Sequence, residues 1–474
     1  MQIPTAADFQ TMTRFAALLG RTSLCRAFAC VAFIATGCGS SARMTATVDG
    51  GGTSDDSGVT SGPTYYQDVA PLLAAKCTMC HRTADIAPFR LDTADAAVAY
   101  AGLMKTATAT RTMPPWPPGP LSPQMLHSRG LTDAQVALFA AWADRGAPLG
   151  DAAHPAPLGT PDIVDIGTAD LAADTGVDYV PDSSLTDDYR CFLVPLGVTE
   201  DHVVTGYRIT PGNRKTVHHV ITSLFASTDR AALEAIDNET PDRAGWPCVG
   251  GAVPLDSTLR VDGSLGAWVP GVSSVLLPAG TGTAIHAGDL AVMQIHYNLL
   301  GGTDPDRTRI ELKFAPKGTE SSLRQLTALR LIRRDLNLPA NQSDIVQENS
   351  FAARVWAGGK FYADGDAYVM MVAGHMHTLG THIAIERRNA QGVTTLLDIP
   401  AWDFHWQGSY LLAQPLVIHA DDQLAVRCTY DNTAEQREAN GWAPGAVTDV
   451  HWGEGTHDEM CLASVVVVDQ APTP

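Results

Sequence analysis

The residues from about 183 onward alternate between apolar and polar side chains over short runs, and this period of two constrains the fold most. In the run 309–314 three apolar residues alternate with three charged ones, and the run 426–430 repeats the alternation. Such a run buries one face of a β-strand and exposes the other. Further strand-like runs are 217–225, 290–299, 367–377, 381–388 and 461–469. Connections rich in Gly and Pro, which number 42 and 30 among 474 residues, separate the runs and favour antiparallel β-sandwiches over a parallel α/β sheet.

The region before residue 150 has a helical period instead. Helical patterns cover 66–76 and 95–106, and Thr132 to Gln135 forms a capping box that opens a third helix ending near Gly146. The sequence therefore predicts a mainly β protein, with two sandwich domains preceded by a small all-α domain.

A CxxCH motif, Cys77-Thr-Met-Cys80-His81, lies in the helical region. This is the attachment pattern of c-type haem, in which the two thiols bond to the haem vinyl groups and His81 becomes the proximal iron ligand. The loop residue Met113 is our predicted sixth ligand, because flanking prolines stiffen its loop, and Met104 on a predicted helix is the alternative. Residues 64–150 resemble class I c-type cytochromes, so a covalent haem is the expected cofactor.

The first residues have the features of an export signal. Three arginines precede the uncharged stretch 27–37, which ends at Cys38. Residues 35–38 resemble a bacterial lipobox, which predicts a signal peptide over 1–37 and a lipid anchor on Cys38; ordinary export with cleavage nearby is the alternative. Residues 38–63 read as a flexible tether. We expect an exported bacterial lipoprotein, periplasmic or associated with the outer membrane, with peripheral membrane attachment through the lipid.

Four cysteines remain after the signal, the anchor and the haem motif, namely Cys191, Cys248, Cys428 and Cys461. An even number in an exported chain favours two disulfides, with three pairings open. We favour Cys191–Cys248 and Cys428–Cys461, because each pair then lies within one predicted domain.

Charge and hydropathy exclude two classes of protein. Lys and Arg number 32 against 51 Asp and Glu, a net charge of −19, so nucleic acid is not an expected partner. Since no apolar run reaches the roughly 18 residues of a spanning helix, a multi-pass membrane protein is excluded.

Three histidines of the first sandwich region are candidate metal ligands. His218 and His219 are adjacent in an apolar strand, where neighbours face opposite ways, so joint ligation requires a twist, a bulge or different ring nitrogens. His296 lies on a polar strand face, where simple solvent contact is the alternative.

Three further candidates lie in the second region. His375 and His377, two residues apart, project from the same side of a strand and can chelate one ion. Met460, beside the predicted disulfide at Cys461, offers a thioether, with core filling as the alternative.

Four motifs carry a family resemblance across roughly residues 183–470. They are TVHHV at 216–220, MQIHYN at 293–298, GHMHTLG at 374–380 and HDEMC at 457–461. Their order resembles that of the copper type II, ascorbate-dependent monooxygenases, which include peptidylglycine α-hydroxylating monooxygenase and dopamine β-monooxygenase. WDFHWQ at 402–407 and CTYDN at 428–432 look like further family landmarks. The resemblance implies two jelly-roll-like sandwiches at 183–318 and 319–474, after a linker at 151–182.

The resemblance also implies two copper ions and their ligands. An electron-transfer copper is expected on His218, His219 and His296, and a catalytic, oxygen-activating copper on His375, His377 and Met460. The donor types agree, since a soft thioether favours Cu(I) and zinc rarely accepts Met.

The implied reaction is hydroxylation of a substrate C–H bond with O₂ and two electrons. The expected partners are a small-molecule substrate, O₂ and a reductant, either ascorbate-like or a redox protein. The haem domain is the expected donor, because its attachment raises the local concentration of donor beside acceptor.

Departures from the family pattern narrow the substrate. Peptide-amidating members carry an Arg and a Tyr where this chain has Ala373 and Ser464, so peptide amidation is not expected. Two other functions stay open: an electron-transfer or copper-binding lipoprotein without oxygenase turnover, and a zinc hydrolase using His375, His377 and a carboxylate such as Asp458.

Residues near the expected ligands have open roles. His405 and His457 lie inside family-like motifs and could support the ligands. Asp458 and Glu459 could be loop charges or could orient the Met460 segment.

Overall fold

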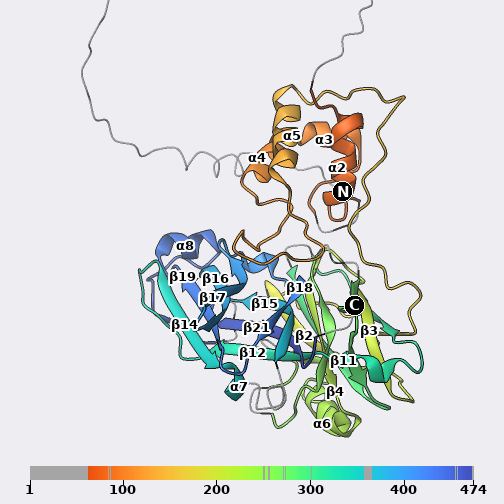
Figure 1. The fold of residues 1–474 in the computed structure, drawn as a ribbon, viewed down its shortest axis with the longest axis vertical. Helices are drawn as coiled ribbons and strands as arrows, with labels where there is room; N and C mark the ends of the chain where they lie inside the picture. Colours follow the sequence, from red (N-terminus) through yellow and green to blue (C-terminus); the bar gives the residue numbers. More distant parts are fainter. Residues whose placement is uncertain are drawn as a thin grey trace, which may run out of the picture. The chain divides into compact units, whose positions relative to one another are not determined.

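The computed structural model describes residues 62–471, except 84, 86, 249–250, 255–256, 271, 273, 300–301, 357–365, 454 and 456. The predicted signal peptide, the anchor Cys38 and nearly all of the predicted tether lie outside the described residues. The described chain is mainly β, with several antiparallel sheets and few helices, as the sequence predicts (Figure 1).

Short helices occupy the region before residue 150. They are the π-helix η1 (Tyr65–Val69) and the α-helices α2 (Ala70–Lys76), α3 (Ala94–Ala99), α4 (Ala101–Ala109) and α5 (Asp133–Asp144). The predicted capping box of α5 is confirmed: Thr132 Oγ1 accepts from Gln135 N at 3.2 Å, and Gln135 Oε1 accepts from Thr132 N at 2.9 Å. Phe139 and Trp142 on this helix are buried in a common core with η1 and α2, so the helices pack as one unit.

The first sandwich is built from a five-stranded and a six-stranded sheet. The five-stranded sheet has the order β5-β2-β9-β4-β6, and the other has the order β1-β10-β3-β8-β11 with β7 beside β3. The strands are β1 (Leu171–Asp174), β2 (Asp187–Pro195), β3 (His202–Thr210), β4 (Val217–Phe225), β5 (Trp246–Pro247), β6 (Gly263–Trp268), β7 (Val275–Leu276), β8 (Thr281–Ile285), β9 (Leu290–Asn298), β10 (Arg309–Phe314) and β11 (Arg324–Gln325). Side chains from both sheets share one buried core.

Two strands of this sandwich lie outside the range 183–318 that the resemblance implies. β1 lies in the predicted linker and pairs with β10, and β11 lies in the second predicted domain and pairs in parallel with β8. Both are too short to show a clear alternation in sequence. The outer face of the five-stranded sheet packs against α6 (Arg230–Asp237), which follows η2 (Ser227–Asp229), and against the segment after β5 whose Cys248 is disulfide-bonded to Cys191 of β2.

The second sandwich is built from two four-stranded sheets. Their orders are β12-β21-β15-β18 and β14-β19-β16-β17, with β13 and β20 forming a separate pair. The elements are η4 (Glu320–Ser322), β12 (Thr327–Arg333), β13 (Asn337–Leu338), β14 (Ile345–Ala352), α7 (Ala353–Trp356), β15 (Ala367–His375), β16 (Gly380–Asn389), β17 (Gly392–Ile399), η5 (Phe404–Trp406), β18 (Ser409–Ile418), β19 (Gln423–Tyr430), α8 (Ala434–Ala439), β20 (Val450–His451) and β21 (Cys461–Val468).

The Cys428–Cys461 disulfide links β19 to β21 and so joins the two sheets through their core. Both favoured disulfide pairings are therefore confirmed. This link places the start of β21, and Met460 just before it, beside the buried interior of the second sandwich.

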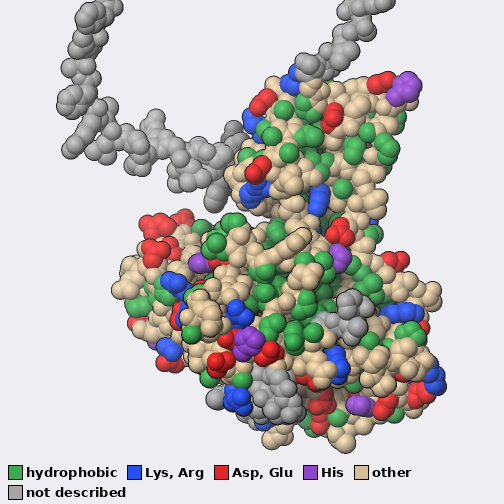
Figure 2. All heavy atoms as spheres, in the orientation of Figure 1, with side chains coloured by type: hydrophobic (Ala, Val, Ile, Leu, Met, Phe, Trp, Pro, Cys, Tyr) green, Lys and Arg blue, Asp and Glu red, His purple; other side chains and the backbone are tan. Residues whose placement is uncertain are grey.

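The surface of the described chain is mixed in charge. On the face shown in Figure 2, acidic and basic side chains are interspersed among apolar and neutral ones. Within the described residues, no helix has the length and apolar character needed to span a bilayer.

Candidate metal centres

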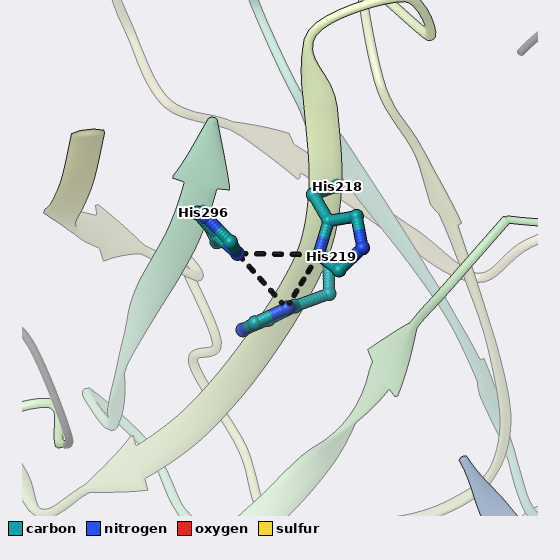
Figure 3. A group of neighbouring side chains, drawn as sticks. All are labelled: His218, His219 and His296. Atoms are coloured by element: carbon teal, nitrogen blue, oxygen red, sulfur yellow. Dashed lines mark hydrogen bonds between the residues drawn. The ribbon is translucent and has the colours of Figure 1, made fainter. Parts of the chain in front are cut away.

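A β-bulge brings His218 and His219 together. In the pairing of β4 with β9, Val217 lies opposite Tyr297 but His219 lies opposite His296, so His218 is the extra residue. A bulge of this kind redirects a side chain that regular alternation would send to the other face. Figure 3 shows both rings turned toward His296 from the neighbouring strand. Joint ligation by adjacent strand residues requires a twist, a bulge or different ring nitrogens, and the structure has the bulge.

The three Nδ1 atoms form a nearly equilateral triangle. His218 Nδ1 lies 3.4 Å from His219 Nδ1 and 3.2 Å from His296 Nδ1, and the third side is 3.4 Å. The point equidistant from all three lies about 1.9 Å from each nitrogen, close to the roughly 2.0 Å bond that imidazole makes to a first-row metal ion such as zinc. Among the described residues, these three form a group able to hold a metal ion. The cluster fits a three-nitrogen metal centre, which here we call the first centre.

His296 is fixed by two residues of β2. Its Nε2–H donates to Asp187 Oδ1 at 2.8 Å, and the ring of Tyr189 stacks on it with centroids 4.1 Å apart and planes 9° apart. Because Nε2 carries the proton, the lone pair is on Nδ1, which faces the other two histidines. His296 is only 1% exposed, so the solvent-contact alternative is wrong. Sequence reasoning misses both partners, since only the β2–β9 register brings them to His296.

Burial keeps two imidazoles of the first centre, those of His218 and His219, neutral. Desolvation, with the neighbouring histidines contributing, lowers the pKa of His218 to about 4 and the pKa of His219 well below its usual range. A neutral imidazole has a free lone pair, which is the form that binds a metal.

His375 and His377 form the basis of a second centre, at the end of β15. Their ring centroids are 5.1 Å apart with planes at 83°. His375 Nδ1 donates to Gln407 Oε1 at 2.6 Å, and His377 Nδ1 donates to the Asp458 carbonyl at 3.0 Å. Both acceptors are oxygens, so the lone pair of each neutral ring is on Nε2. The two centres therefore use opposite ring nitrogens.

Burial also holds these two rings neutral. Desolvation lowers the pKa of His375, and desolvation together with His375 lowers the pKa of His377 to about 3. The sequence analysis does not identify Gln407 as a partner of His375. The WDFHWQ motif, which ends at Gln407, is the sequence signal that points to it.

The buried carboxylate of Glu459 ties Met460 to His377. Glu459 Oε2 accepts from His377 N at 2.9 Å and from Met460 N at 3.2 Å, while Oε1 accepts from Leu379 N at 2.6 Å. Tyr430 donates its hydroxyl to the Met460 carbonyl at 2.8 Å. These bonds bring the backbone of the Met460 segment to the same carboxylate as the His377 backbone. The orienting role left open for Glu459 is therefore the one observed.

Asp458 contributes through its backbone instead. Its carbonyl accepts from the His377 ring, whereas its side-chain carboxylate accepts from Gly455 N at 3.0 Å. Burial raises the pKa of the neighbouring Glu459 to about 8, while the backbone N–H groups that donate to both of its oxygens favour the charged form. Met460, the predicted third donor of the second centre, is buried at 5% exposed, and its backbone N–H and that of His377 donate to the same Glu459 oxygen.

The predicted haem ligands lie in the helical region. Cys77 and Cys80 are free thiols, and His81 Nδ1 donates to the Phe89 carbonyl at 3.0 Å, which puts its lone pair on Nε2. This donor set fits covalent attachment of a haem with His81 as axial ligand. Met113 is half-buried in the loop after α4, whereas Met104 is buried in the helical core. Met104 therefore has the core role that its helical position predicts.

Comparison with known proteins gives one informative match. Residues 363–470 match the family model of the copper type II ascorbate-dependent monooxygenase, C-terminal domain. The match includes His375, His377 and Met460, and at the level of the family it supports a copper-dependent monooxygenase. A search of curated proteins gives no match.

Three solved structures show a weak likeness to this chain. A protein described as secreted, from Eubacterium rectale, is 10% identical with a TM-score of 0.18, covering 60% of this chain and 69% of that one. Allantoicase is 10% identical with a TM-score of 0.15, covering 52% and 78%, and a structure of infectious bursal disease virus, Gx strain, is 8% identical with a TM-score of 0.16, covering 66% and 76%. Likenesses this weak do not define the fold.

Proposed function

We propose that this chain is an exported, copper-dependent monooxygenase that hydroxylates a C–H bond of a small molecule with O₂ and two electrons. The observation that carries the proposal is the convergence of three imidazole nitrogens at bonding distance from one point, in the same chain as a domain that matches a copper monooxygenase family. Copper, when bound, supplies the activation of O₂ and the one-electron chemistry.

The two donor sets suit different tasks. His218, His219 and His296 offer three nitrogens from a rigid sheet, which suits an electron-transfer centre that keeps its geometry. His375, His377 and Met460 add a thioether, which favours Cu(I) and makes this the centre for O₂. His296, His377 and Met460 are buried, which limits access of water to these ligands, and desolvation lowers the pKa of His218, His219, His375 and His377.

The sheet beside the second centre bears on the substrate. Ala373 shares a strand face with His375, and its cross-strand neighbours are Ser409 and Ser464. Arg330 lies one strand further out, opposite Ser464. A substrate held at Ala373 therefore has two hydroxyl-bearing residues as direct neighbours, and the cation of this row, Arg330, lies two strands away. We infer a neutral or apolar substrate rather than a peptide with a free carboxylate.

The proposal includes a covalent haem on Cys77 and Cys80, with His81 and Met113 as axial ligands, as electron donor to the first centre. A contact just after the CxxCH motif supports the haem as donor. Asp85, four residues after His81, lies 3.8 Å from the guanidinium of Arg214, which precedes β4 and its His218. An ascorbate-like reductant or a separate redox protein is the alternative donor. A lipid on Cys38 and a periplasmic or outer-membrane location complete the proposal.

Anaerobic stopped-flow spectroscopy tests the donor. Prereduced haem in the Cu(II)-loaded full chain should be reoxidised in a single phase, which His296→Ala should slow or abolish. Equal haem reoxidation in the two proteins would remove the haem as donor to the first centre.

Metal stoichiometry with O₂ uptake tests the oxygenase. The wild-type chain should bind two coppers and consume O₂ in step with hydroxylated product across a panel of neutral small molecules, and the His375→Ala/His377→Ala variant should not. Copper binding without substrate-dependent O₂ uptake would leave an electron-transfer or copper-binding protein. A chain that took up zinc but no copper would favour the hydrolase.

A further inference from the structure

One short segment of the second sandwich contacts ligands of both candidate centres. This segment, Trp402–Gln407, connects β17 to β18 and contains η5. It belongs to neither ligand set, so its contacts are separate from metal binding itself. Together they point to a link between the centres.

The segment holds the second centre from two sides. Gln407 Oε1 accepts from His375 Nδ1 at 2.6 Å, and Gln407 Nε2 in turn donates to the Phe404 carbonyl at 2.9 Å. Trp402 Nε1 donates to the His377 carbonyl at 3.1 Å. The amide of Gln407 thus connects a ligand ring directly to the turn at Phe404.

The same turn reaches the first centre through His405. The His405 ring lies 6.1 Å from the His218 ring, centroid to centroid, at 87°. The backbone of His405 is also hydrogen bonded to the His218 side chain, which partly offsets the lowering of the His218 pKa by burial. His405 is therefore one point at which the second sandwich contacts a ligand of the first, and His375 also lies within electrostatic range of His219.

These contacts form a continuous series of rings between the centres. The centroid distances are 6.1 Å from His218 to His405, 5.9 Å from His405 to Phe404, and 5.9 Å from Phe404 to His377. Each ring meets the next edge-on, at 75° to 87°. Edge-to-face pairs of this kind are attractive and directional, so each ring restricts the next.

Asp403 fixes the turn in this position. Its Oδ1 accepts from His405 N at 2.9 Å and from His405 Nδ1 at 3.0 Å, so one carboxylate oxygen holds both the backbone and the ring. The His405 side chain is 58% exposed, so packing restrains the ring only in part and this bond adds to the restraint. Asp403 therefore presets the ring that faces His218.

We propose that the Trp402–Gln407 segment couples the two centres, with His405 as the positioning residue through which the second sandwich sets the orientation of His218. The inference rests on the proposed function, because it takes both histidine clusters as copper sites. It adds that a residue of the other sandwich, His405, supports the ligand set of the first centre. Support of this kind for a metal ligand typically changes affinity by about 10-fold or more.

Electron paramagnetic resonance of the Cu(II)-loaded full chain tests the inference. The wild-type spectrum minus that of His296→Ala isolates the first-centre signal, and the same subtraction is made in a His405→Ala background. We expect His405→Ala to change the parallel hyperfine splitting of the first-centre signal and to weaken its copper affinity about 10-fold. His405→Phe, which keeps a ring against His218 but loses the bond from the ring to Asp403, should lie closer to wild type than His405→Ala in both measurements.

His419→Ala is the matched control. His419 lies in the same sandwich and donates to Asp366 Oδ1 at 2.7 Å, so it is an exposed histidine paired with an aspartate, like His405. A His405→Ala signal identical to that of His419→Ala would overturn the inference, as would a His405→Phe signal as altered as that of His405→Ala. A wild-type chain with no first-centre signal would instead overturn the proposed function.

Discussion

At the scale of single residues, both centres depend on hydrogen bonds that decide which ring nitrogen carries a lone pair. Asp187 accepts a hydrogen bond from His296 Nε2–H. Gln407 and the Asp458 carbonyl accept hydrogen bonds from the Nδ1–H groups of His375 and His377. A neutral imidazole has a proton on one ring nitrogen and a lone pair on the other. The hydrogen-bond acceptor beside the ring determines which nitrogen carries the proton. The supporting residues are therefore as necessary as the ligands.

Replacing Asp187 by Ala should weaken the first centre. The substitution leaves His296 Nε2–H without its acceptor and frees the ring to change tautomer, so copper affinity should fall about 10-fold to 100-fold. Competitive copper titration measures this, and Asp187→Asn, which keeps an oxygen acceptor, should recover part of the loss. Asp201→Ala is the control, because Asp201 pairs with the exposed His286. Equal affinities in Asp187→Ala and Asp201→Ala would refute the tautomer assignment.

Replacing Glu459 by Ala should destabilise the second sandwich. Three buried N–H groups, those of His377, Leu379 and Met460, lose their acceptor. At about 1 kcal/mol or more for each unsatisfied group, the free energy of unfolding should fall by about 3 kcal/mol. Urea denaturation of the copper-free chain measures the change, with the exposed Glu435→Ala as control. A loss no larger than that of Glu435→Ala would show that Glu459 does not organise the ligand segments.

At the scale of elements, each centre is built where a strand departs from regular pairing or ends. The bulge in β4 turns His218 and His219 to one side of the sheet. β15 pairs with β21 and ends at His375, so His377 lies just past its end, near the start of β21. The Cys428–Cys461 disulfide fixes β21 to β19 next to Met460. The candidate ligands thus lie at a bulge, near the end of one strand and just before the start of another.

Removal of either disulfide should lower the stability of the chain, but removal of only one of them should weaken metal binding. Replacing Cys428 and Cys461 by Ala removes a cross-link spanning 33 residues, and replacing Cys191 and Cys248 removes one spanning 57. The chain-entropy model gives a similar loss for both, about 4 kcal/mol. Only the first pair adjoins a ligand, so only its loss should weaken Cu(I) binding at the second centre. Competition with a Cu(I) chelator measures this, and equal weakening by both pairs would contradict the account.

Much of this architecture is predictable at the level of elements. Alternation predicts β4 as 217–225, and the observed strand has these bounds. Adjacent histidines require a bulge or a twist, and a bulge is present. Asp187 and Tyr189 are not predictable, because their contact with His296 comes from the β2–β9 register. The short β1 is assigned to a linker, since four residues stabilised by pairing with β10 show no period of their own.

At the scale of the whole molecule, the two sandwiches keep titratable groups neutral in the absence of metal. The folded pKa values of His218 and His377, about 4 and about 3, lie below the 6.5 of an unfolded histidine. The unfolded chain therefore binds more protons than the folded one as pH falls below about 6.5. Stability that is present above this pH is lost progressively toward pH 4.

Acidification should accordingly destabilise the copper-free chain. Each such histidine contributes a slope of up to about 1.4 kcal/mol per pH unit between pH 6.5 and 4. Burial raises the pKa of Glu459 to about 8. Between pH 8 and 4.5 the folded chain therefore binds more protons at Glu459 than the unfolded chain, and this contribution to stability grows as pH falls. Comparing wild type with His377→Phe isolates the histidine contribution, because Glu459 is present in both. Urea unfolding at pH 4.5 and 6.5 should give a smaller difference for His377→Phe, and equal differences would disprove neutral burial of His377.

X-ray absorption spectroscopy of the fully reduced, copper-loaded chain tests the pair of unlike centres most directly. One copper should have only nitrogen neighbours and the other two nitrogens and a sulfur, so the average is half a sulfur atom per copper at about 2.3 Å, the distance of a metal–sulfur bond. Met460→Ala should remove the sulfur signal, and His296→Ala should raise it toward one sulfur per copper. A spectrum without sulfur in the wild type, or an unchanged sulfur signal in Met460→Ala, would contradict the assignment of the second centre.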